Sequence, residues 1–569
     1  MKKLIILLPV LIILVFALLA GRSLLAPGYF NMHDDLQMMR QLEMEKCFLD
    51  LQIPCRWVPD MGYGFGFPLF NYYPPLPYLL GLIFRFAGFS FVGAVKIVFL
   101  LSFLFSGIAM YFFSKEFFGK LGGILSSIFY IWAPYRAIDV YVRGAMNEVW
   151  SFVWFPLILW TGYRLFISRK KESAKWIVCL ALSWAGLFLS HNLMVLIFTP
   201  VFVLWMLLFF VREKKWKKIF LYVKSGIIAL GLTAFFTLPS FLEQKYVQVG
   251  TLVSGYYEYI AHFATVNQLL FSRFWGYGAS IWMEKDGMPF QIGHFHWILS
   301  LIVLIFLTVL FLRKKKDLKH LVLFRILPLF ILIGWISAFM AHSRSIFIWQ
   351  IIPALKFVQF PWRFLTLVTF SFSFISGFIV VILKKLIPKY YVLCTATLAI
   401  ALVAFNWNYF LPEGGRMGAM TDDQKFSGAK WDMQRTAGIL DYLPITAKEN
   451  PKGPQESLVD VMEGEAEIND AIQKTNWAKF LTVSDQPLTV RINIFKFPNW
   501  RVFIDGKETK ISIPETEKWG RMYIKVPEGT HEVYLKLYNT PLRTITNFIS
   551  LASWLGLIGY LVLQFKRGR

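Results

Sequence analysis

Long apolar runs alternate with short polar segments along most of the chain. The run lengths are close to the roughly 20 residues that a helix needs to cross a bilayer. The pattern therefore predicts an α-helical polytopic membrane protein with about twelve transmembrane helices. The apolar runs cover residues 4–20, 91–113, 121–135, 148–167, 176–190, 193–211, 219–239, 293–312, 321–341, 364–383, 389–407 and 545–564.

Two apolar segments need a separate interpretation. Residues 4–20 follow two lysines like a signal peptide, but no clean A-x-A cleavage site comes after them, which favours a retained first span. Residues 76–89 are short, follow Pro74, Pro75 and Pro77, and contain Arg85. We interpret this second segment as a helix that lies at the membrane interface without crossing it.

Basic residues gather in the short segments between apolar runs, and their positions predict the topology. If residues 76–89 do not cross and the N-terminus is inside, every basic segment lies on the cytoplasmic side, as the positive-inside rule requires. The chain is then a multi-pass protein of the cell (cytoplasmic) membrane with both termini inside. The basic segments are 2–3, 115–120, 169–175, 212–218, 313–319, 384–389 and 566–569.

The net charge of +24 gives no reason to expect a nucleic-acid partner. Only 17% of residues are charged whereas 56% are hydrophobic, and the excess basic residues sit at predicted membrane boundaries. There they suit anionic lipid headgroups, so membrane lipid is the expected partner. No base-stacking or phosphate-reading module interrupts the pattern.

The predicted topology leaves long segments on the outer face. We expect a transmembrane domain at 1–407 with an outer loop at 21–90, an extracytoplasmic region at 408–544, and a final helix with a basic tail at 545–569. The region 408–544 holds near-alternating strand patterns with Asp505-Gly506 and Glu528-Gly529 turns. They predict a small β-sandwich-like domain at about 480–540, whereas 414–475 is less readable and is compatible with a helical or a loosely ordered segment. The strand patterns cover 491–497, 501–513, 522–526 and 531–538.

Four cysteines are too few for a disulfide scaffold. Cys179 and Cys394 lie in apolar runs and are interpreted as core residues. Cys47 and Cys55 share the first outer loop, where a bridge could persist. The sequence is equally compatible with a Cys47–Cys55 disulfide and with two free thiols.

The first outer loop contains a compact group of polar residues, His33, Asp34 and Asp35. Two adjacent carboxylates beside a histidine could activate a hydroxyl as a general base or hold a divalent cation. The alternative is a solvated cap for a helix that begins near Leu36. No cofactor other than such a cation is suggested.

With these residues in view, the chain resembles the GT-C superfamily of membrane glycosyltransferases. More closely, it is similar to the YfhO-like or "6-pyruvoyl-tetrahydropterin synthase-related" membrane proteins, although nothing in it resembles a soluble pterin enzyme. The segments that carry the resemblance are GYGFGFPLFNYYPPLPY (62–78), YVRGAMNE (141–148), SHN (190–192), GHFH (293–296), QFPWR (359–363) and PNWRVFIDG (498–506).

The resemblance implies a sugar donor carried on a polyprenyl phosphate. The sugar would pass to a lipid, glycan or protein acceptor on the outer face, and the acidic residue of the first loop would act as the base. On this hypothesis Asp34, or less favourably Asp35, deprotonates the acceptor, and Arg143 and Arg363 stabilise the leaving phosphate.

Other outer residues fit such a site, and each has a simpler alternative. Arg143 could bind the donor phosphate and Glu148 sugar hydroxyls, or the two could form a salt bridge. Arg363 could contact a lipid phosphate or only anchor a helix at headgroup depth.

Histidines at two other places are further candidates. His191 and Asn192 lie at an outer turn, where they either contact substrate or face water. His294 and His296 could join the acidic pair around a metal, although hydrogen bonding at the interface is the simpler interpretation.

Two other classes of function stay open. The first is a transporter or flippase for a lipid-linked glycan, which the placement of charges at the edges of the apolar runs disfavours. The second is a non-catalytic membrane scaffold that displays a glycan-binding β-domain.

Overall fold

The computed structural model describes residues 2–283, 285–313, 323–437 and 442–567. The chain divides into two compact units, each assembled from stretches that are distant in sequence. Unit 1 comprises Met1–Asp35, Val92–Ala229 and Val253–Met420, and unit 2 comprises Leu36–Phe91, Leu230–Leu252 and Thr421–Arg569. Residues 36–90 of the predicted first outer loop belong to unit 2, together with the C-terminal part of the chain, whereas residues 21–35 belong to unit 1.

Unit 1 is helical. A single long element, α6, contains two predicted spans as an antiparallel hairpin: Gly119 breaks the helix with φ +74°, and the Ser127 hydroxyl donates to the Gly107 carbonyl at 2.8 Å. The principal helices are α1 (Lys2–Ala20), α2 (Arg22–Leu25), α6 (Phe91–Ile131), α7 (Pro134–Ala137), η1 (Ile138–Val142), α8 (Met146–Ile167), α9 (Lys170–Phe188), α10 (Asn192–Glu213), η2 (Trp216–Lys218), α11 (Ile219–Leu242, shared with unit 2), α12 (His294–Leu312), α13 (Leu323–Met340), α14 (Ile346–Ile351), η11 (Pro361–Phe364), α15 (Leu365–Ser376), α16 (Phe378–Leu386) and α17 (Tyr391–Asn406).

Within the described residues, 8 helices are long and apolar enough to cross a membrane. This confirms a polytopic helical architecture but not the predicted number of spans. The eight are Phe91–Ile131, Asn192–Glu213, Trp216–Leu242, His294–Leu312, Leu323–Met340, Pro361–Leu386, Tyr391–Tyr409 and Pro541–Gln564.

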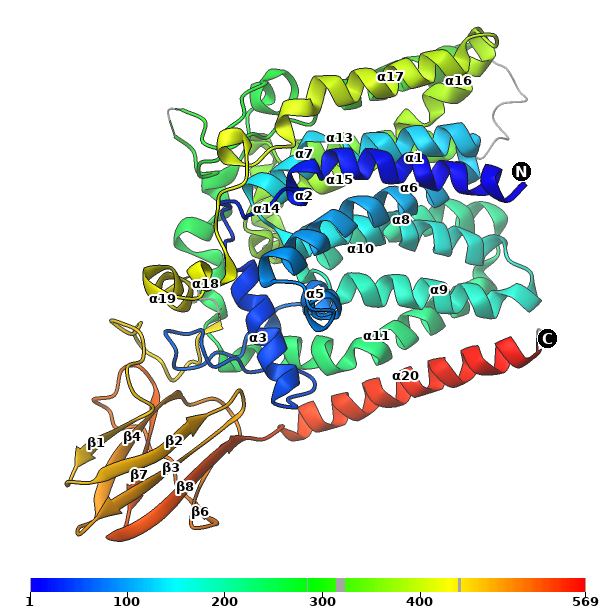
Figure 1. The fold of residues 1–569 in the computed structure, drawn as a ribbon. Coiled ribbons are helices and arrows are strands. Elements are labelled where there is room, and N and C mark those ends of the chain that lie inside the picture. The colour runs from blue at the N-terminus through cyan, green and yellow to red at the C-terminus, as the bar shows by residue number, and fades with distance from the viewer. Residues whose placement is uncertain (1, 284, 314–322, 438–441, 568–569) are drawn as a thin grey trace. The chain divides into compact units, whose positions relative to one another are not determined.

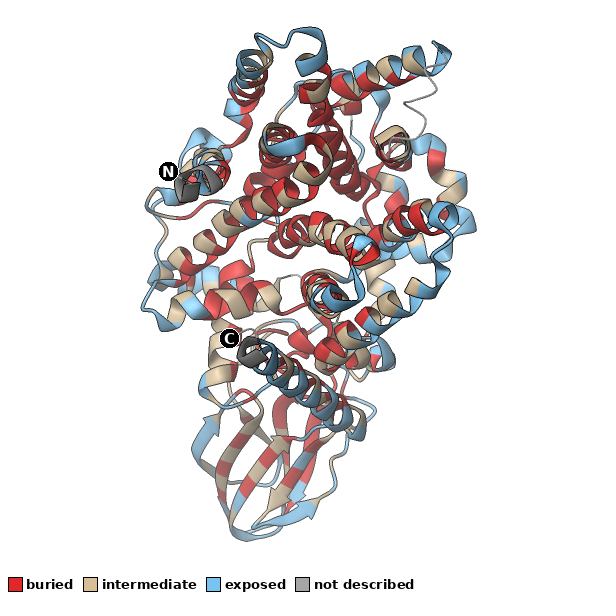
Figure 2. Ribbon diagram, turned by 90° about the vertical axis from the view of Figure 1, so that its right-hand side faces the viewer, coloured by how far each residue is buried: buried red, intermediate tan, exposed pale blue. Residues whose placement is uncertain are grey.

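The apolar helices differ greatly in how much protein covers them. In Pro361–Leu386 the most apolar window is 94% buried, and Phe374 of this segment contacts Phe113 and Phe330 at ring-centroid distances of 4.6 and 4.3 Å. The corresponding window of Pro541–Gln564 is only 17% buried, and the helix that ends at the C-terminus is mostly pale blue in Figure 2. An apolar helix with so little protein cover is suited to lipid.

In unit 1, basic segments gather at one end of the helices. Arg164, near the end of α8, pairs with Glu116 of the basic segment 115–120 at 3.4 Å. Lys218 of the basic segment 212–218 donates to the carbonyl of Ser168, next to the segment 169–175, at 2.9 Å. These three basic segments therefore lie at the same end of the helices. Figure 1 shows the N-terminus and the α16–α17 turn at one end of these helices and α7 and α14 at the other. The predicted topology requires such a separation. Of the basic segment 313–319, residues 314–319 lie outside the described residues.

Unit 2 begins with the larger part of the first outer loop. The predicted segment 76–89 contains a helix, α5, and Cys47 is disulfide-bonded to Cys55 with their Cα atoms 5.4 Å apart. Cys179 and Cys394 are free and half-buried. The principal helices of unit 2 are α3 (Gln37–Leu49), α4 (Leu69–Tyr72), α5 (Leu76–Phe86), η3 (Gln244–Tyr246), η4 (Val249–Val253, ending in unit 1), α18 (Asp422–Lys425), α19 (Gly428–Thr436) and α20 (Pro541–Arg567).

The C-terminal part of unit 2 contains a domain of two antiparallel sheets, with strand orders β1-β4-β7 and β2-β3-β8-β5-β6. The predicted Asp505-Gly506 turn joins β5 to β6, and both residues have positive φ (48° and 77°), as a two-residue hairpin turn requires. The strands are β1 (Val459–Glu463), β2 (Glu467–Gln473), β3 (Trp477–Ser484), β4 (Leu488–Phe495), β5 (Trp500–Ile504), β6 (Lys507–Thr509), β7 (Arg521–Val526) and β8 (Gly529–Leu537).

The β-domain is larger than the sequence predicts. Its first strand starts at Val459, so β1 and β2 fall within 414–475, where no pattern was recognisable. β2 shows why, because all of its residues are exposed or half-buried and its polar and apolar positions do not alternate.

Candidate functional site

The acidic segment of the first outer loop is held against the short helix η1 in unit 1. The backbone amide of His33 donates to the Val142 carbonyl at 3.0 Å, and that of Asp34 donates to the Arg143 carbonyl at 2.9 Å. Asp34 and Asp35 are half-buried, whereas His33 is exposed and its Nε2 lies 3.0 Å from the Tyr277 carbonyl. The predicted acid and the predicted phosphate ligand Arg143 are therefore close together.

Gly144 permits this close approach. It has φ +62°, a conformation that side chains disfavour, and a Cβ placed on it would collide with the Met32 side chain. The chain thus reverses immediately after Arg143, which lets residues 32–34 pack along 142–144.

Arg143 pairs with two carboxylates and a phenol. Its Nη2 lies 2.8 Å from Glu148 Oε2, its Nη1 contacts Asp139 and donates to the Tyr135 hydroxyl at 3.2 Å, and its guanidinium stacks 4.4 Å from the Trp362 ring centre. This is the salt bridge that the sequence left open as the simpler alternative. It occupies part of the guanidinium fork that a phosphate would use.

Arg363 reaches the same carboxylate from a different part of the chain. Its Nε lies 3.4 Å from Glu148 Oε2, and its Nη1 donates to the Val358 carbonyl at 2.8 Å and to Gln359 Oε1 at 2.9 Å. Glu148 is only 1% exposed and also accepts from the Tyr135 hydroxyl at 2.7 Å. We refer to Tyr135, Asp139, Arg143, Glu148 and Arg363 as the Glu148 cluster.

The charge balance of the Glu148 cluster favours an anionic ligand. Burial, followed by the charge of Glu148, raises the pKa of Asp139 well above its ordinary value. A raised pKa favours the neutral form of Asp139, and in that form two guanidiniums face a single carboxylate. The excess positive charge would suit a phosphate better than a neutral group.

The turn between α9 and α10 approaches this cluster. The Asn147 amide donates to the Ser190 carbonyl at 2.9 Å, which ties the turn to the start of α8. His191 caps α10 by accepting from the Leu193 amide, and burial together with the charge of Arg363 lowers its pKa, so its ring is neutral. Asn192, the first residue of α10, is exposed.

The two histidines near the start of α12 do not gather other metal ligands. His296 is fully buried and its Nε2 lies 3.0 Å from the Phe129 carbonyl, and the His294 ring packs 5.5 Å from that of Phe405. Across the described ranges of the chain, no group of three or more His, Cys, Asp or Glu side chains is arranged to hold a metal ion.

Sequence reasoning missed several members of this site. Asp139 lies four residues before Arg143, a spacing that places the two on one face of a helical turn, and this signal could have identified it. Tyr135, Asn147 and Gln359 carry no comparable signal because their partners are distant or depend on local loop geometry.

Comparison with known proteins leaves the family open. No family model matches the chain. A protein of Lactococcus lactis subsp. cremoris (strain MG1363), described as an uncharacterized protein, is 24% identical over 291 residues, which make up 48% of this chain and 44% of that protein. This chain therefore spans less than half the length of that relative.

Comparison with solved structures also found similarity. The crystal structure of ArnT from Cupriavidus metallidurans bound to undecaprenyl phosphate aligns over 70% of each chain, with a TM-score of 0.40 and 10% sequence identity. A similarity of this size establishes neither a common fold nor a common activity.

Proposed function

We propose that this chain is a membrane glycosyltransferase of the GT-C type. It would transfer a sugar from a polyprenyl-phosphate donor to a lipid, glycan or protein acceptor on the outer face of the membrane. The observation that carries the proposal is the convergence of three distant segments of unit 1. The backbone amide of Asp34 donates to the backbone carbonyl of Arg143. Arg143 and Arg363 both contact the Glu148 carboxylate.

In the proposed reaction, Asp34 and the two arginines would have separate roles. The Asp34 carboxylate takes the proton of an acceptor hydroxyl, and the resulting oxygen attacks the anomeric carbon of the donor sugar. The new glycosidic C–O bond forms as the bond from this carbon to the phosphate oxygen breaks, and polyprenyl phosphate leaves with the electron pair. Arg143 and Arg363 stabilise the charge that develops on the phosphate.

Within this proposal Glu148 is a positioning residue. It holds both guanidiniums through one oxygen, so their charges remain close together. The role first considered for Glu148, hydrogen bonding to sugar hydroxyls, is less favoured because its two oxygens already contact Tyr135, Arg143 and Arg363.

The test compares cell-surface glycans and polyprenyl-linked sugars by mass spectrometry in cells with wild-type protein or Asp34→Asn. We expect the variant to insert normally and to lose roughly 10² to 10⁴ in transfer rate, with the donor accumulating. Asp35→Asn is the matched control and should lose less. Full transfer by a normally inserted Asp34→Asn protein would eliminate the assignment, and movement of a lipid-linked glycan without a new glycosidic bond would favour the flippase alternative.

A further inference from the structure

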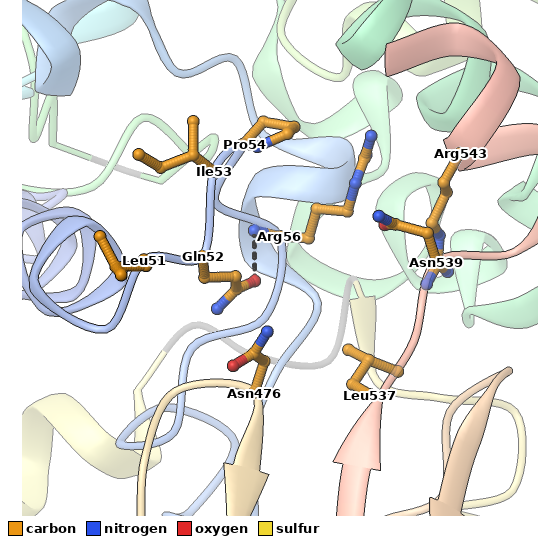
Figure 3. A pocket seen from close by; sticks show the side chains of 9 residues that line it. All are labelled: Leu51, Gln52, Ile53, Pro54, Arg56, Asn476, Leu537, Asn539 and Arg543. Carbon is orange, nitrogen blue, oxygen red and sulfur yellow. Dashed lines mark hydrogen bonds between the residues drawn. The ribbon is translucent and has the colours of Figure 1, made fainter. Parts of the chain in front are cut away.

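Unit 2 contains a pocket that is separate from the residues considered above. It has a volume of about 140 Å³ and lies between the loop that follows α3, one end of the β-domain and the first turn of α20 (Figure 3). The Gln52 side chain shapes the loop side by accepting from the Arg56 amide at 2.8 Å. The lining residues are Leu51, Gln52, Ile53, Pro54, Arg56, Asn476, Leu537, Asn539 and Arg543.

Two buried arginines border this pocket. Arg543 Nε donates to Glu243 Oε2 at 2.8 Å, and its guanidinium packs 4.8 Å from the Phe497 ring centre. Arg56 donates to the amide oxygens of Asn71 and Asn547 at 2.8 and 2.7 Å, and to a backbone carbonyl. Its hydrogen-bond partners are thus all uncharged.

The charges of this arrangement do not cancel. Arg56 and Arg543 are 4% and 1% exposed. Arg543 contacts the carboxylate of Glu243. Burial, followed by the charge of Arg543, lowers the pKa of Arg56 to about 9, which leaves its guanidinium ionised at neutral pH. The group therefore holds two positive charges against one negative charge.

The guanidinium of Arg543 also has an unused donor. Its Nη2 is buried and has no acceptor within the described part of the chain. A buried N–H without an acceptor costs about 1 to 3 kcal/mol, and more when the group is charged. Because Arg543 also lies in the first turn of a 27-residue helix, the helix dipole adds to the attraction for an anion.

The mouth of the pocket indicates where such an anion would come from. Asn476 is half-buried and Asn539 is exposed, so their amides can donate from the β-domain side. On the loop side, Leu51 and Ile53 are 82% and 62% exposed. Exposed apolar side chains beside the start of a lipid-suited helix place this pocket at the depth of lipid headgroups.

From these observations we propose that the pocket is a binding site for a phosphate group. Asn476 lines one side of the pocket and Asn539 and Arg543 line the other (Figure 3), so a phosphate between them could accept from both sides. The group could be carried by a membrane phospholipid or be free phosphate. The proposal does not depend on the glycosyltransferase assignment, because none of these residues belongs to the Glu148 cluster.

The experiment measures binding of two probes to the full chain in detergent by native mass spectrometry: inorganic phosphate and dihexanoylphosphatidylglycerol. Asn539→Asp places a negative charge at the mouth and should weaken binding roughly tenfold or more. Asn469→Asp makes the same change at an exposed position of β2 and should bind like wild type. Arg543→Lys keeps the charge but loses the second donor direction, and should also weaken binding.

Each outcome decides the proposal. Binding of the lipid but not of inorganic phosphate, with loss in Asn539→Asp, supports a headgroup site, and the reverse preference supports a site for free phosphate. If wild type binds neither probe, or if Asn539→Asp and Asn469→Asp bind equally, the proposal is wrong. Thermal unfolding of each variant identifies misfolding, and because Asn539 is exposed whereas Arg543 is buried, the Asn539→Asp variant remains informative if Arg543→Lys fails to fold.

Discussion

The backbone amide of Asp34 donates a hydrogen bond to the backbone carbonyl of Arg143 at 2.9 Å. This contact joins the acidic segment to the arginine that pairs with Glu148. Because the hydrogen bond is between backbone groups, substituting either side chain leaves it available. Side-chain variants in this region therefore report on chemistry and charge more than on the position of the segment.

Glu148 and Asp139 should differ sharply in what they contribute. Glu148→Gln removes the charge that two guanidiniums share, so we expect a loss of about 3–5 kcal/mol in the free energy of unfolding. Asp139→Asn should cost about 1 kcal/mol, because the raised pKa of Asp139 favours the neutral carboxyl, which an amide resembles in charge. Thermal or denaturant unfolding of the detergent-solubilised proteins measures both. Equal losses would contradict the charge balance derived for the cluster.

The positions of the helices along the chain were more predictable than the contacts within the Glu148 cluster. Run length and the basic turns are local properties, so α10, α12 and α15 lie where the apolar pattern placed them. The partners of a buried charge depend on the folded chain. The sequence suggested Arg143 with Glu148 but could not show that Arg363 shares the same oxygen.

In unit 2, the strands and the disulfide were likewise predictable only where the local sequence determines them. β5 and β6 were predictable because a two-residue Asp-Gly turn separates them, whereas β2 has a charged and largely exposed sequence without alternation. The spacing of Cys47 and Cys55 allowed a bridge without requiring one. Only the turn at Leu51, which has φ +57°, and the packing of the loop bring the two cysteines together.

Replacing Gly144 should displace the acidic segment. Gly144→Ala introduces a Cβ at φ +62° and against Met32, so we expect a loss of about 1–2 kcal/mol in stability and a fall in transfer activity. Adding Met32→Ala relieves the contact but not the backbone strain, so it should restore only part of both. Gly250→Ala, at a glycine with open space around it and no positive φ, should have little effect. Wild-type unfolding and activity in Gly144→Ala would show that the close approach is unimportant.

Removing the disulfide should loosen the loop that carries Arg56. Cys47 and Cys55 are 8 positions apart, and closing a loop of that size contributes about 2–3 kcal/mol in the chain-entropy model. Cys47→Ser with Cys55→Ser should therefore lower the unfolding temperature and make it insensitive to reductant. Cys179→Ser removes a free thiol instead and should keep the wild-type response to reductant. An unfolding temperature of the double variant equal to that of wild type would contradict the prediction.

A pH-sensitive pair in the β-domain involves His531 and Asp505. His531 Nδ1 lies 2.5 Å from Asp505 Oδ2, and this hydrogen bond raises the pKa of His531 above 6.5 and lowers that of Asp505 below 3.8. A raised histidine pKa stabilises the fold below pH 6.5, and the effect is lost as pH rises through the folded-state value. A lowered aspartate pKa stabilises it above pH 3.8, and that effect is lost as pH falls through its folded-state value.

The stabilisation from this pair should therefore be greatest between about pH 4 and 6.5. His531→Gln should lower the unfolding temperature of the full chain more at pH 5.5 than at pH 8.5, because the stabilisation is lost as pH rises through the folded-state pKa of His531. Because Asp505 is exposed, solvent screening limits the size of the difference, and added salt should reduce it further. Chemical shifts of a labelled His531 ring measure its pKa directly. A value at or below 6.5, or the same effect of His531→Gln at both pH values, would show that the charged pair does not form in solution.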